Sequence, residues 1–224
     1  MTALRRPVTR LLDLALPPIC AGCGTEGDAI CPACLPSVGS RVALPPGTPL
    51  GLAEGPPDPL LQLEWCSPFA GPTRRALHAL KYRGERRLAA PLGTVVAERW
   101  RRAGAGGDIL VPVPVHQARR RERGYDQAAL IAAVAAERLR LPWRVAVVRT
   151  RVTTAQYHLD RRHRASNVAE AFAMDPAAHA AIAGRWVVLV DDVVTTGATL
   201  CETARAILAG GAAAVSAITV ARER

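Results

Sequence analysis

The hydrophobic residues that follow residue 60 form two kinds of segment that alternate along the chain. Short, nearly continuous apolar runs rich in β-branched residues predict strands at 108–115, 143–150, 184–192 and 213–222. Longer segments with apolar residues at helical spacing predict helices at 73–102, 126–141 and 198–211. Strands that are almost wholly apolar and alternate with helices are typical of a parallel sheet covered on both faces. The sequence therefore predicts the α/β class.

A stretch dense in proline and glycine, residues 35–60, precedes these segments. Such a composition disfavours a helix or an inner strand and predicts a linker or a loop-rich neck. We therefore expect a small N-terminal module in residues 1–60 and a main domain in residues 61–224. A length of 224 residues and a hydrophobic content of 50% suit one core of ordinary size with a small appendage.

The N-terminal module contains a regular cysteine pattern. Four of the six cysteines form two C-x2-C pairs separated by seven residues: Cys20, Cys23, Cys31 and Cys34. Two tight turns that each present two thiolates are the arrangement that a tetrahedral zinc ion selects, so we expect a structural Zn²⁺ here. Disulfides are the competing interpretation and an iron–sulfur cluster is a lesser one. Cys66 and Cys201 have no comparable spacing, and we assign them no chemistry.

The chain shows no sign of a membrane span or of a secretion signal. No window approaches the roughly 18 uninterrupted apolar residues that a spanning helix needs. The apolar N-terminal stretch at 11–18 contains Asp13 and ends in two prolines, which does not fit a signal peptide. We expect a cytoplasmic protein.

The chain is strongly basic, with 29 Lys and Arg against 19 Asp and Glu and a formal net charge of +10. An excess of this size suits a phosphate-rich ligand or a nucleic acid. The alternative is that abundant Ala, Arg, Gly and Pro reflect a GC-rich coding sequence, which would scatter arginine over the surface without any binding role. Local clusters of charge therefore matter more than the sum.

The segment VVLVDDVVTTGATL, residues 187–200, concentrates candidate chemistry. Ligands of open parallel sheets bind at the carboxyl ends of the strands, where Asp191 and Asp192 would emerge. Two neighbouring carboxylates can accept hydrogen bonds from ribose hydroxyls and hold Mg²⁺ directly or through water, so we expect both to be catalytic. Residues 195–199 then offer hydroxyl donors and a glycine at a helix N-terminus, which favours a phosphate. The expected binding residues are Asp191, Asp192, Val193, Val194, Thr195, Thr196, Gly197, Ala198 and Thr199.

This segment resembles the phosphoribosyl pyrophosphate (PRPP) binding motif of type I phosphoribosyltransferases, in which a strand is followed by two acidic residues and a Thr-Thr-Gly-x-Thr loop. Over nearly its full length the chain resembles the ComF family of competence and gluconate-utilisation proteins. Besides the cysteine pairs, the resemblance rests on KYRG at 81–84, VPVPV at 111–115, RRRERGYDQA at 119–128, RTRVTTAQYHLDRRHRASN at 149–167 and Phe172. The resemblance implies a phosphoribosyltransferase-like fold.

The resemblance also implies that the loop after residues 111–115 faces pyrophosphate and that residues 149–167 form a region that can cover the site. Arginine is a planar, permanently charged donor that suits pyrophosphate. The expected pyrophosphate-facing residues are Arg120, Arg123 and Arg164. Two departures from the family pattern are Asp126, where the family usually has Asn, and the small number of cysteines, which indicates a minimal zinc module.

Five further residues lie among these motifs. The histidines His116, His158 and His163 have no orienting partner in the sequence, and we expect them to be solvated loop residues rather than general bases. For Lys81 and Tyr82, a phosphate contact and an ordinary pair at a helix end are equally consistent with the sequence.

Three classes of function fit the sequence. The first is an enzyme that uses Mg²⁺ to transfer phosphoribose from PRPP to a nitrogen nucleophile, with pyrophosphate released. The second is a non-catalytic sensor of PRPP or a nucleotide. The third is an accessory protein of DNA uptake that binds single-stranded DNA or a helicase-like partner. An aromatic content of 4% offers few base-stacking platforms, so direct DNA binding ranks below nucleotide binding.

Overall fold

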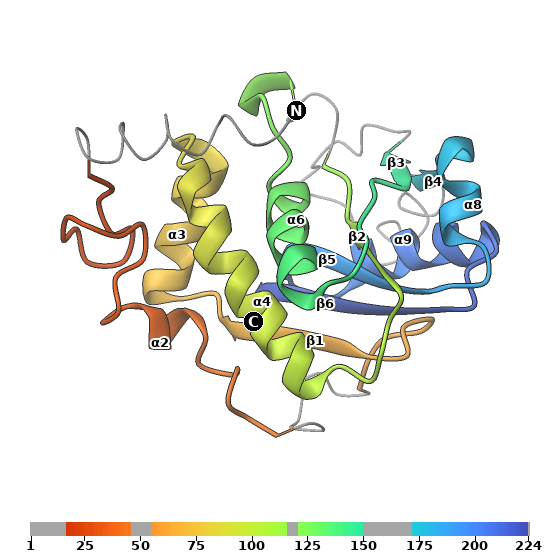
Figure 1. Ribbon diagram of the computed structural model, residues 1–224, viewed down its shortest axis with the longest axis horizontal. Helices are drawn as coiled ribbons and strands as arrows, with labels where there is room; N and C mark the ends of the chain where they lie inside the picture. Colours follow the sequence, from red (N-terminus) through yellow and green to blue (C-terminus); the bar gives the residue numbers. More distant parts are fainter. Residues whose placement is uncertain (1–16, 46–54, 116–120, 150–171, 224) are drawn as a thin grey trace, which may run out of the picture.

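A four-stranded parallel sheet forms the centre of the molecule (Figure 1). The computed structural model describes residues 17–45, 55–115, 121–149 and 172–223. The strands of the sheet lie in the order β1 (Leu63–Pro68), β6 (Ala214–Arg222), β5 (Trp186–Val194) and β2 (Ile109–Pro112). All three neighbouring pairs are parallel, so the prediction of an α/β fold with a parallel sheet is confirmed.

Strand β5 is paired along its whole length on one side only. With β6 it pairs from Trp186 through Val194, whereas with β2 the pairing ends at Val190. The last bond on that side runs from the Val113 N–H to the Val190 carbonyl, at 2.9 Å. The next N–H on that side belongs to Val115, and it donates to Asp126 Oδ2 at 3.3 Å instead of to β5. The last four residues of β5 therefore extend past their neighbour β2.

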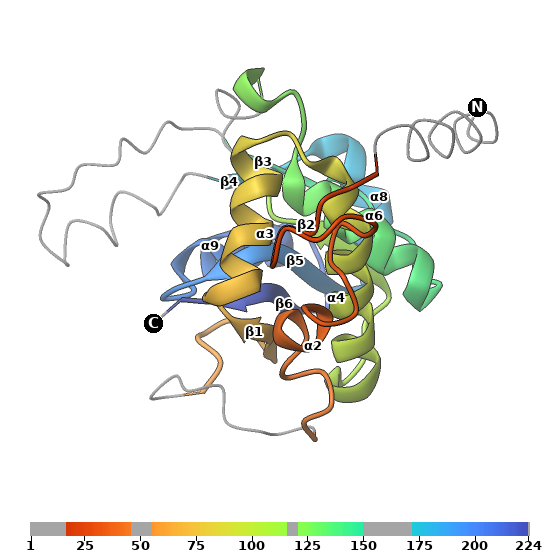
Figure 2. The ribbon, with the colours of Figure 1, turned by 90° about the vertical axis from the view of Figure 1, so that its left-hand side faces the viewer.

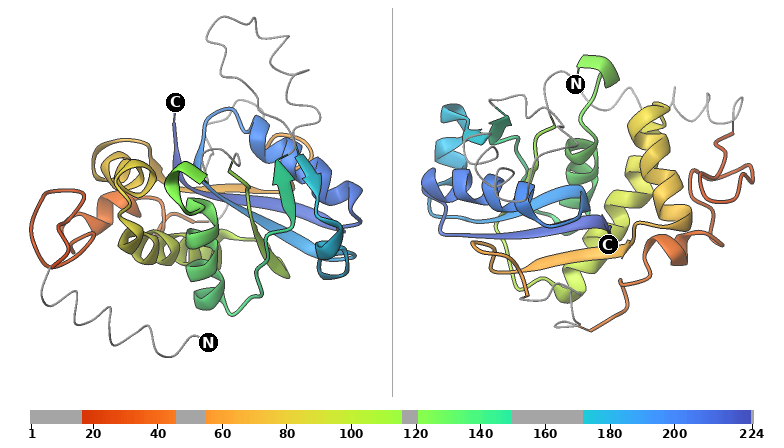
Figure 3. Two further views of the ribbon diagram at one scale, coloured as in Figure 1. Left: turned by 90° about the horizontal axis from the view of Figure 1, so that it is seen from above. Right: turned by 180° about the vertical axis from the view of Figure 1, so that it is seen from behind.

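Helices cover both faces of the sheet, as Figure 3 shows. The helices on one face are α3 (Gly71–Tyr82), α4 (Ala89–Ala103) and α6 (Gln127–Leu139). They form a core with alternate residues of the sheet, such as Val188, Val190 and Ile218. The other face is covered by α9 (Ala198–Ala209) and the short α8 (His179–Ile182). Residues of opposite parity, such as Val187 and Leu189, form a second core there, as the period-2 alternation of a strand requires.

Shorter elements complete the described fold. They are α2 (Leu35–Val38), the 3₁₀ helices η1 (Arg86–Leu88) and η2 (Pro176–Ala178), and an antiparallel pair made of β3 (Val147–Arg149) and β4 (Phe172–Met174). The strand predicted at 143–150 is thus divided. Trp143 makes an isolated bridge to Leu110 at the edge of β2, and only Val147–Arg149 pairs further. The helix predicted at 73–102 is likewise divided into α3, η1 and α4.

The cysteine segment packs directly on the main core. Ile30, Cys34 and Val38 belong to the same cluster as Leu77 and Leu80 of α3. In Figure 2 this segment, drawn in red and orange, lies against α3 and α2. The contact is close, since a Cβ atom added to Gly22 would lie 3.2 Å from the Pro72 Cβ of α3. The division of the chain near residue 60 stays a prediction.

A buried ion pair attaches the chain that follows the cysteines to the sheet. The Arg99 side chain of α4 is fully buried and donates through Nε and Nη2 to Glu64 Oε2 of β1, at 2.9 and 2.7 Å. Its Nη1 donates to the carbonyl oxygens of Arg41 and Leu44, at 2.8 and 2.6 Å. The Arg41 guanidinium lies 4.0 Å from the ring centre of Trp65. One arginine therefore connects α4, β1 and residues 41–44.

A helix that spans a bilayer needs about 20 predominantly apolar residues. None of the described helices is long and apolar enough to cross a membrane.

Candidate functional site

Asp191 and Asp192 lie within the part of β5 that extends past β2. They were expected at the end of the strand, but β5 continues to Val194 because β6 pairs with it that far. Because β2 ends early, no described strand lies beside Asp191 and Asp192 on that side of β5. The site is therefore open on that side. The position at the carboxyl end of the sheet is the one that open α/β folds use for ligands.

The two carboxylates face different surroundings, because neighbouring residues of a strand point to opposite faces. Asp192 is 5% exposed and points toward α3 and α6. Its Oδ2 lies 2.7 Å from Lys81 Nζ and accepts a hydrogen bond from Gln127 Nε2 at 3.2 Å. Asp191 is half-buried, and its Oδ1 accepts the backbone N–H of Asp192 at 2.8 Å.

The electrostatics of Asp191 favour its neutral form. Burial raises the pKa of the Asp191 carboxyl well above its ordinary value, and the charge of Asp192 raises it further. The hydrogen bond from the Asp192 backbone and the charge of Lys81 act in the opposite direction but are smaller. A cation placed beside Asp191 would favour the charged form of the carboxyl and lower this pKa.

The loop between β5 and α9 lines a small hollow. Its empty volume is about 240 Å³, and it is lined by Asp191, Val193, Val194, Thr195, Thr196, Gly197, Ala198, Thr199 and Leu200. Gly197 caps α9 with a φ of 85°, a conformation that suits glycine. The three threonines are exposed, and the N-terminal N–H groups of α9 lie at this loop. The hollow has the donors that a phosphate needs.

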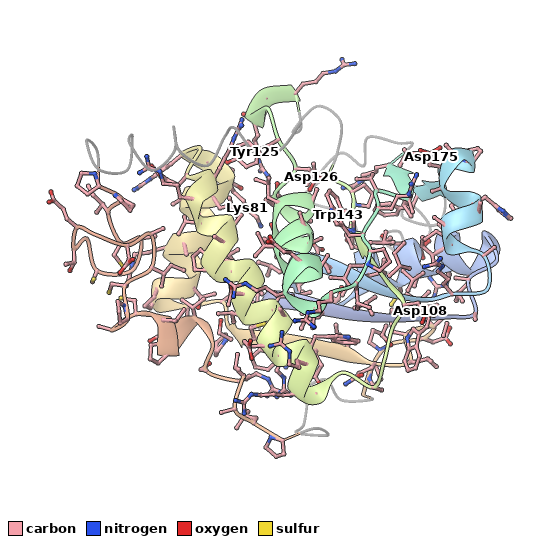
Figure 4. The ribbon with its side chains drawn as sticks, in the orientation of Figure 1. Lys81, Asp108, Tyr125, Asp126, Trp143 and Asp175 are labelled. Atoms are coloured by element: carbon pink, nitrogen blue, oxygen red, sulfur yellow. The ribbon has the colours of Figure 1, made fainter. Side chains whose placement is uncertain are left out.

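A second, larger hollow lies on the other side of the aspartates. Its empty volume is about 580 Å³, and its lining comprises Lys81, Tyr82, Val113, Pro114, Val115, Arg123, Gln127, Arg149, Asp191, Asp192 and Thr199. Asp191 and Thr199 line both hollows, so the two are adjacent. In Figure 4 Lys81 lies between α3 and α6, below Tyr125 and Asp126.

Arg123 is the predicted pyrophosphate-facing residue that lies among the described ones, and it lines the second hollow. Its Nη1 donates to Gln127 Oε1 at 3.1 Å, and its guanidinium lies 5.0 Å from the ring centre of Tyr82. The other two, Arg120 and Arg164, lie outside the described residues, as do His116, His158 and His163.

Sequence reasoning missed Gln127 and Arg149 as residues of this hollow. A signal for Gln127 existed, because the first turn of a helix that follows a strand faces the carboxyl end of the sheet. Arg149 is the first residue of the arginine-rich stretch 149–167, of which only this residue is described.

Asp126 caps α6 and also fixes the chain after β2. Its Oδ1 accepts the Ala129 N–H at 3.1 Å, and its Oδ2 accepts the Val115 N–H at 3.3 Å. An asparagine would place its NH₂ group, a donor, opposite one of these two N–H groups. The aspartate therefore uses both oxygens to hold two elements that border the second hollow.

The four clustered cysteines form a separate candidate metal centre. Their sulfur atoms all lie within 4.8 Å of one another, and none is in a disulfide. Tetrahedral zinc with Zn–S bonds of about 2.3 Å requires S···S distances of about 3.8 Å. Burial opposes ionisation of Cys20, but backbone N–H groups, including those of Cys31 and Gly22 at 3.3 Å, lower the pKa of its thiol to about 6. The donor set fits a metal such as zinc.

Two comparisons with known proteins bear on the family. A model of the phosphoribosyl transferase domain matches residues 126–224, which include the aspartates and the threonine loop. The DNA utilization protein YhgH of Escherichia coli (strain K12) is 33% identical over 204 residues, which cover 88% of this chain and 86% of that protein. The chain belongs to the ComF family of type I phosphoribosyltransferase-like proteins.

Two further matches cover less of the chain. Competence protein F of Haemophilus influenzae (strain ATCC 51907 / DSM 11121 / KW20 / Rd) is 35% identical over 96 residues, which cover 42% of each protein. A solved structure titled "Structure of the allosteric regulatory enzyme of purine biosynthesis" covers 58% of this chain and 26% of its own, with 18% identity and a TM-score of 0.41.

Proposed function

We propose that this protein binds PRPP with Mg²⁺ and transfers the phosphoribosyl group to a nitrogen nucleophile. The observation that carries the proposal is the arrangement of two adjacent hollows that meet at Asp191. One has hydroxyl groups and a helix N-terminus, and the other has cationic side chains. PRPP has the matching arrangement, with a 5′-phosphate on one side of the ribose and a diphosphate on the other.

The residues of the site have distinct roles in this proposal. Residues 195–199 bind the 5′-phosphate through backbone N–H groups and hydroxyls. Asp191 and Asp192 accept hydrogen bonds from the ribose hydroxyls. Arg123, together with Arg120 and Arg164, faces the pyrophosphate.

The aspartates also suit Mg²⁺, which prefers carboxylate oxygens. Among the contacts of the described residues, the Oδ2 of Asp191 accepts no hydrogen bond, so it is open to a ligand. When bound, the ion would neutralise charge on the diphosphate.

In the transfer, the bond from C1 of ribose to the diphosphate breaks with its electron pair on the leaving oxygen. The nitrogen lone pair forms the new C1–N bond, and any proton on that nitrogen passes to water. The arginines stabilise the charge on the departing group.

Two measurements on the parent protein test this proposal. PRPP is expected to raise the melting temperature only when Mg²⁺ is present, because binding to the folded state alone stabilises it. Pyrophosphate release is then assayed with PRPP and a panel of nitrogen bases. Release that requires a base identifies a transferase. Binding without release identifies the non-catalytic sensor and contradicts the catalytic part of the proposal.

For the N-terminal module we propose one structural zinc ion per chain, held by Cys20, Cys23, Cys31 and Cys34. Elemental analysis of protein purified without added metal is expected to find about one zinc per chain, since structural sites of this type bind tightly. Cys31→Ser is expected to lose most of the zinc and to lower the melting temperature. Cys201→Ala serves as the control, because Cys201 is buried outside the cluster. Zinc-free parent protein with these four cysteines in disulfides would contradict the proposal.

A second candidate function is binding of single-stranded DNA, which the names of the relatives favour, since one is a DNA utilization protein and another a competence protein. Arginine clusters at 119–123 and 161–164 would contact the backbone, so affinity should fall steeply with salt and depend little on sequence. Fluorescence anisotropy with short oligonucleotides at two salt concentrations measures both properties. Absence of binding at low salt excludes direct DNA binding and leaves a protein partner of the uptake machinery.

A further inference from the structure

The cations around the site are unevenly distributed. Lys81, Arg123 and Arg149 all line the second hollow, whereas the described lining of the first includes no lysine or arginine. A ligand with its 5′-phosphate in the first hollow therefore directs its substituent at C1 toward these cations. Lys81 is the member of this group that directly contacts one of the two aspartates.

Lys81 has a fixed position from which it can reach a ligand. It lies in the last turn of α3, where the helix C-terminus favours a positive charge. Its Nζ is 2.7 Å from Asp192 Oδ2, and its side chain remains 20% exposed beside the hollow. Arg123 is already engaged by Gln127 and Tyr82. Lys81 has three N–H donors, so a contact with Asp192 leaves donors for a second acceptor.

We propose that Lys81 is a binding residue for the diphosphate at C1 of the ligand, and that Asp192 holds its ammonium group in position until the ligand arrives. This proposal rests on the proposed function, because it assumes a phosphoribosyl ligand in the adjacent hollow. Ribose hydroxyls then donate to Asp192 in place of the lysine, and the lysine donates to the diphosphate. The exchange keeps the buried carboxylate paired in both states, which avoids the cost of an unpaired buried charge.

Three probes separate this role from a purely structural one: PRPP, inorganic pyrophosphate and ribose 5-phosphate, which has no diphosphate. Affinities are measured by calorimetry with Mg²⁺ for the parent, Lys81→Met and Arg83→Met. Arg83 is an exposed cation two residues further along, so its loss changes the net charge equally. Lys81→Met is expected to weaken PRPP and pyrophosphate by about 10- to 100-fold, the effect of one hydrogen bond to a charged group. Ribose 5-phosphate affinity is expected to stay within about twofold in both variants.

Each other outcome is decisive. Losses of affinity for PRPP and ribose 5-phosphate with pyrophosphate unaffected in Lys81→Met would mean that Lys81 only positions Asp192. If Lys81→Met loses no more affinity for PRPP and pyrophosphate than Arg83→Met does, a contact between Lys81 and the diphosphate is excluded. Both results overturn the inference and leave PRPP binding intact, whereas a parent that binds neither PRPP nor pyrophosphate overturns both proposals.

If Lys81→Met does not fold because the Asp192 charge is left unpaired, a second comparison applies. Asp192→Asn removes that charge, and the double variant with Lys81→Met has no unpaired buried ion. Pyrophosphate is expected to bind the double variant about 10- to 100-fold more weakly than it binds Asp192→Asn. Equal affinity would contradict the proposal.

Discussion

Replacement of Asp191 and Asp192 by asparagine together is expected to abolish the Mg²⁺-dependent rise in melting temperature that PRPP produces in the parent protein. A ligand at about 100 times its Kd stabilises a protein by about 2.7 kcal/mol, so the loss is large enough to measure. Asparagine keeps the shape but removes both the negative charge and an acceptor oxygen. Differential scanning fluorimetry with and without PRPP and Mg²⁺ makes the measurement.

The unliganded variant should remain folded. Because burial raises the pKa of the Asp191 carboxyl, the folded state accepts a neutral side chain at this position. Asp175→Asn is the matched control, since Asp175 caps η2 outside the lining of both hollows and its side chain accepts the Ala177 N–H at 3.0 Å. A full PRPP shift in the double variant would show that the assigned site is wrong.

Gly197→Val is expected to abolish the PRPP shift as well, but it is a less specific probe. A side chain at a φ of 85° strains the backbone, and a Cβ atom there would lie 3.0 Å from Pro57 Cγ. Loss of binding in this variant therefore has to be read together with its melting temperature without ligand.

Arg99→Met is expected to lower the free energy of unfolding by about 3–5 kcal/mol, the usual cost of removing one partner of a buried ion pair. The variant leaves Glu64, which is 3% exposed, without its cation, and it leaves the carbonyls of Arg41 and Leu44 without their donor. Urea denaturation followed by circular dichroism measures the change.

Two further variants test the cause of this loss. Arg101→Met lies on the same helix, but Arg101 pairs with Glu98 at the exposed surface, and its loss should cost no more than about 1 kcal/mol. Arg99→Met combined with Glu64→Leu removes both buried charges and should recover much of the lost stability. If Arg99→Met costs no more than Arg101→Met, the buried pair does not hold residues 41–44 in place.

The features that could be predicted from the sequence are those encoded within one short segment. The threonine loop and the paired cysteines are of this kind, because their chemistry depends on spacings of a few residues. The α/β class also followed from local patterns, since hydrophobic periodicity distinguishes strands from helices.

Features that depend on distant residues could not be predicted. Strand β1 was missed because Glu64 and Ser67 interrupt its apolar pattern. Both are buried beside partners from other elements: Arg99 pairs with Glu64, and the hydroxyl of Thr73 lies 2.9 Å from that of Ser67. The contact between Gln127 and Asp192 joins residues 65 positions apart, and no local pattern reports such a pair.

The order of strands in the sheet has a consequence for folding during synthesis. β6 is the last described strand along the chain, yet it lies between β1 and β5. β1 is made early and has β6 as its strand partner, with Leu63 opposite Ala217. A ribosome must therefore complete residues 214–222 before β1 can pair, and until then the edges of β1 and β5 stay open to wrong partners. The sheet forms late and through contacts between residues far apart in sequence, which makes folding slow.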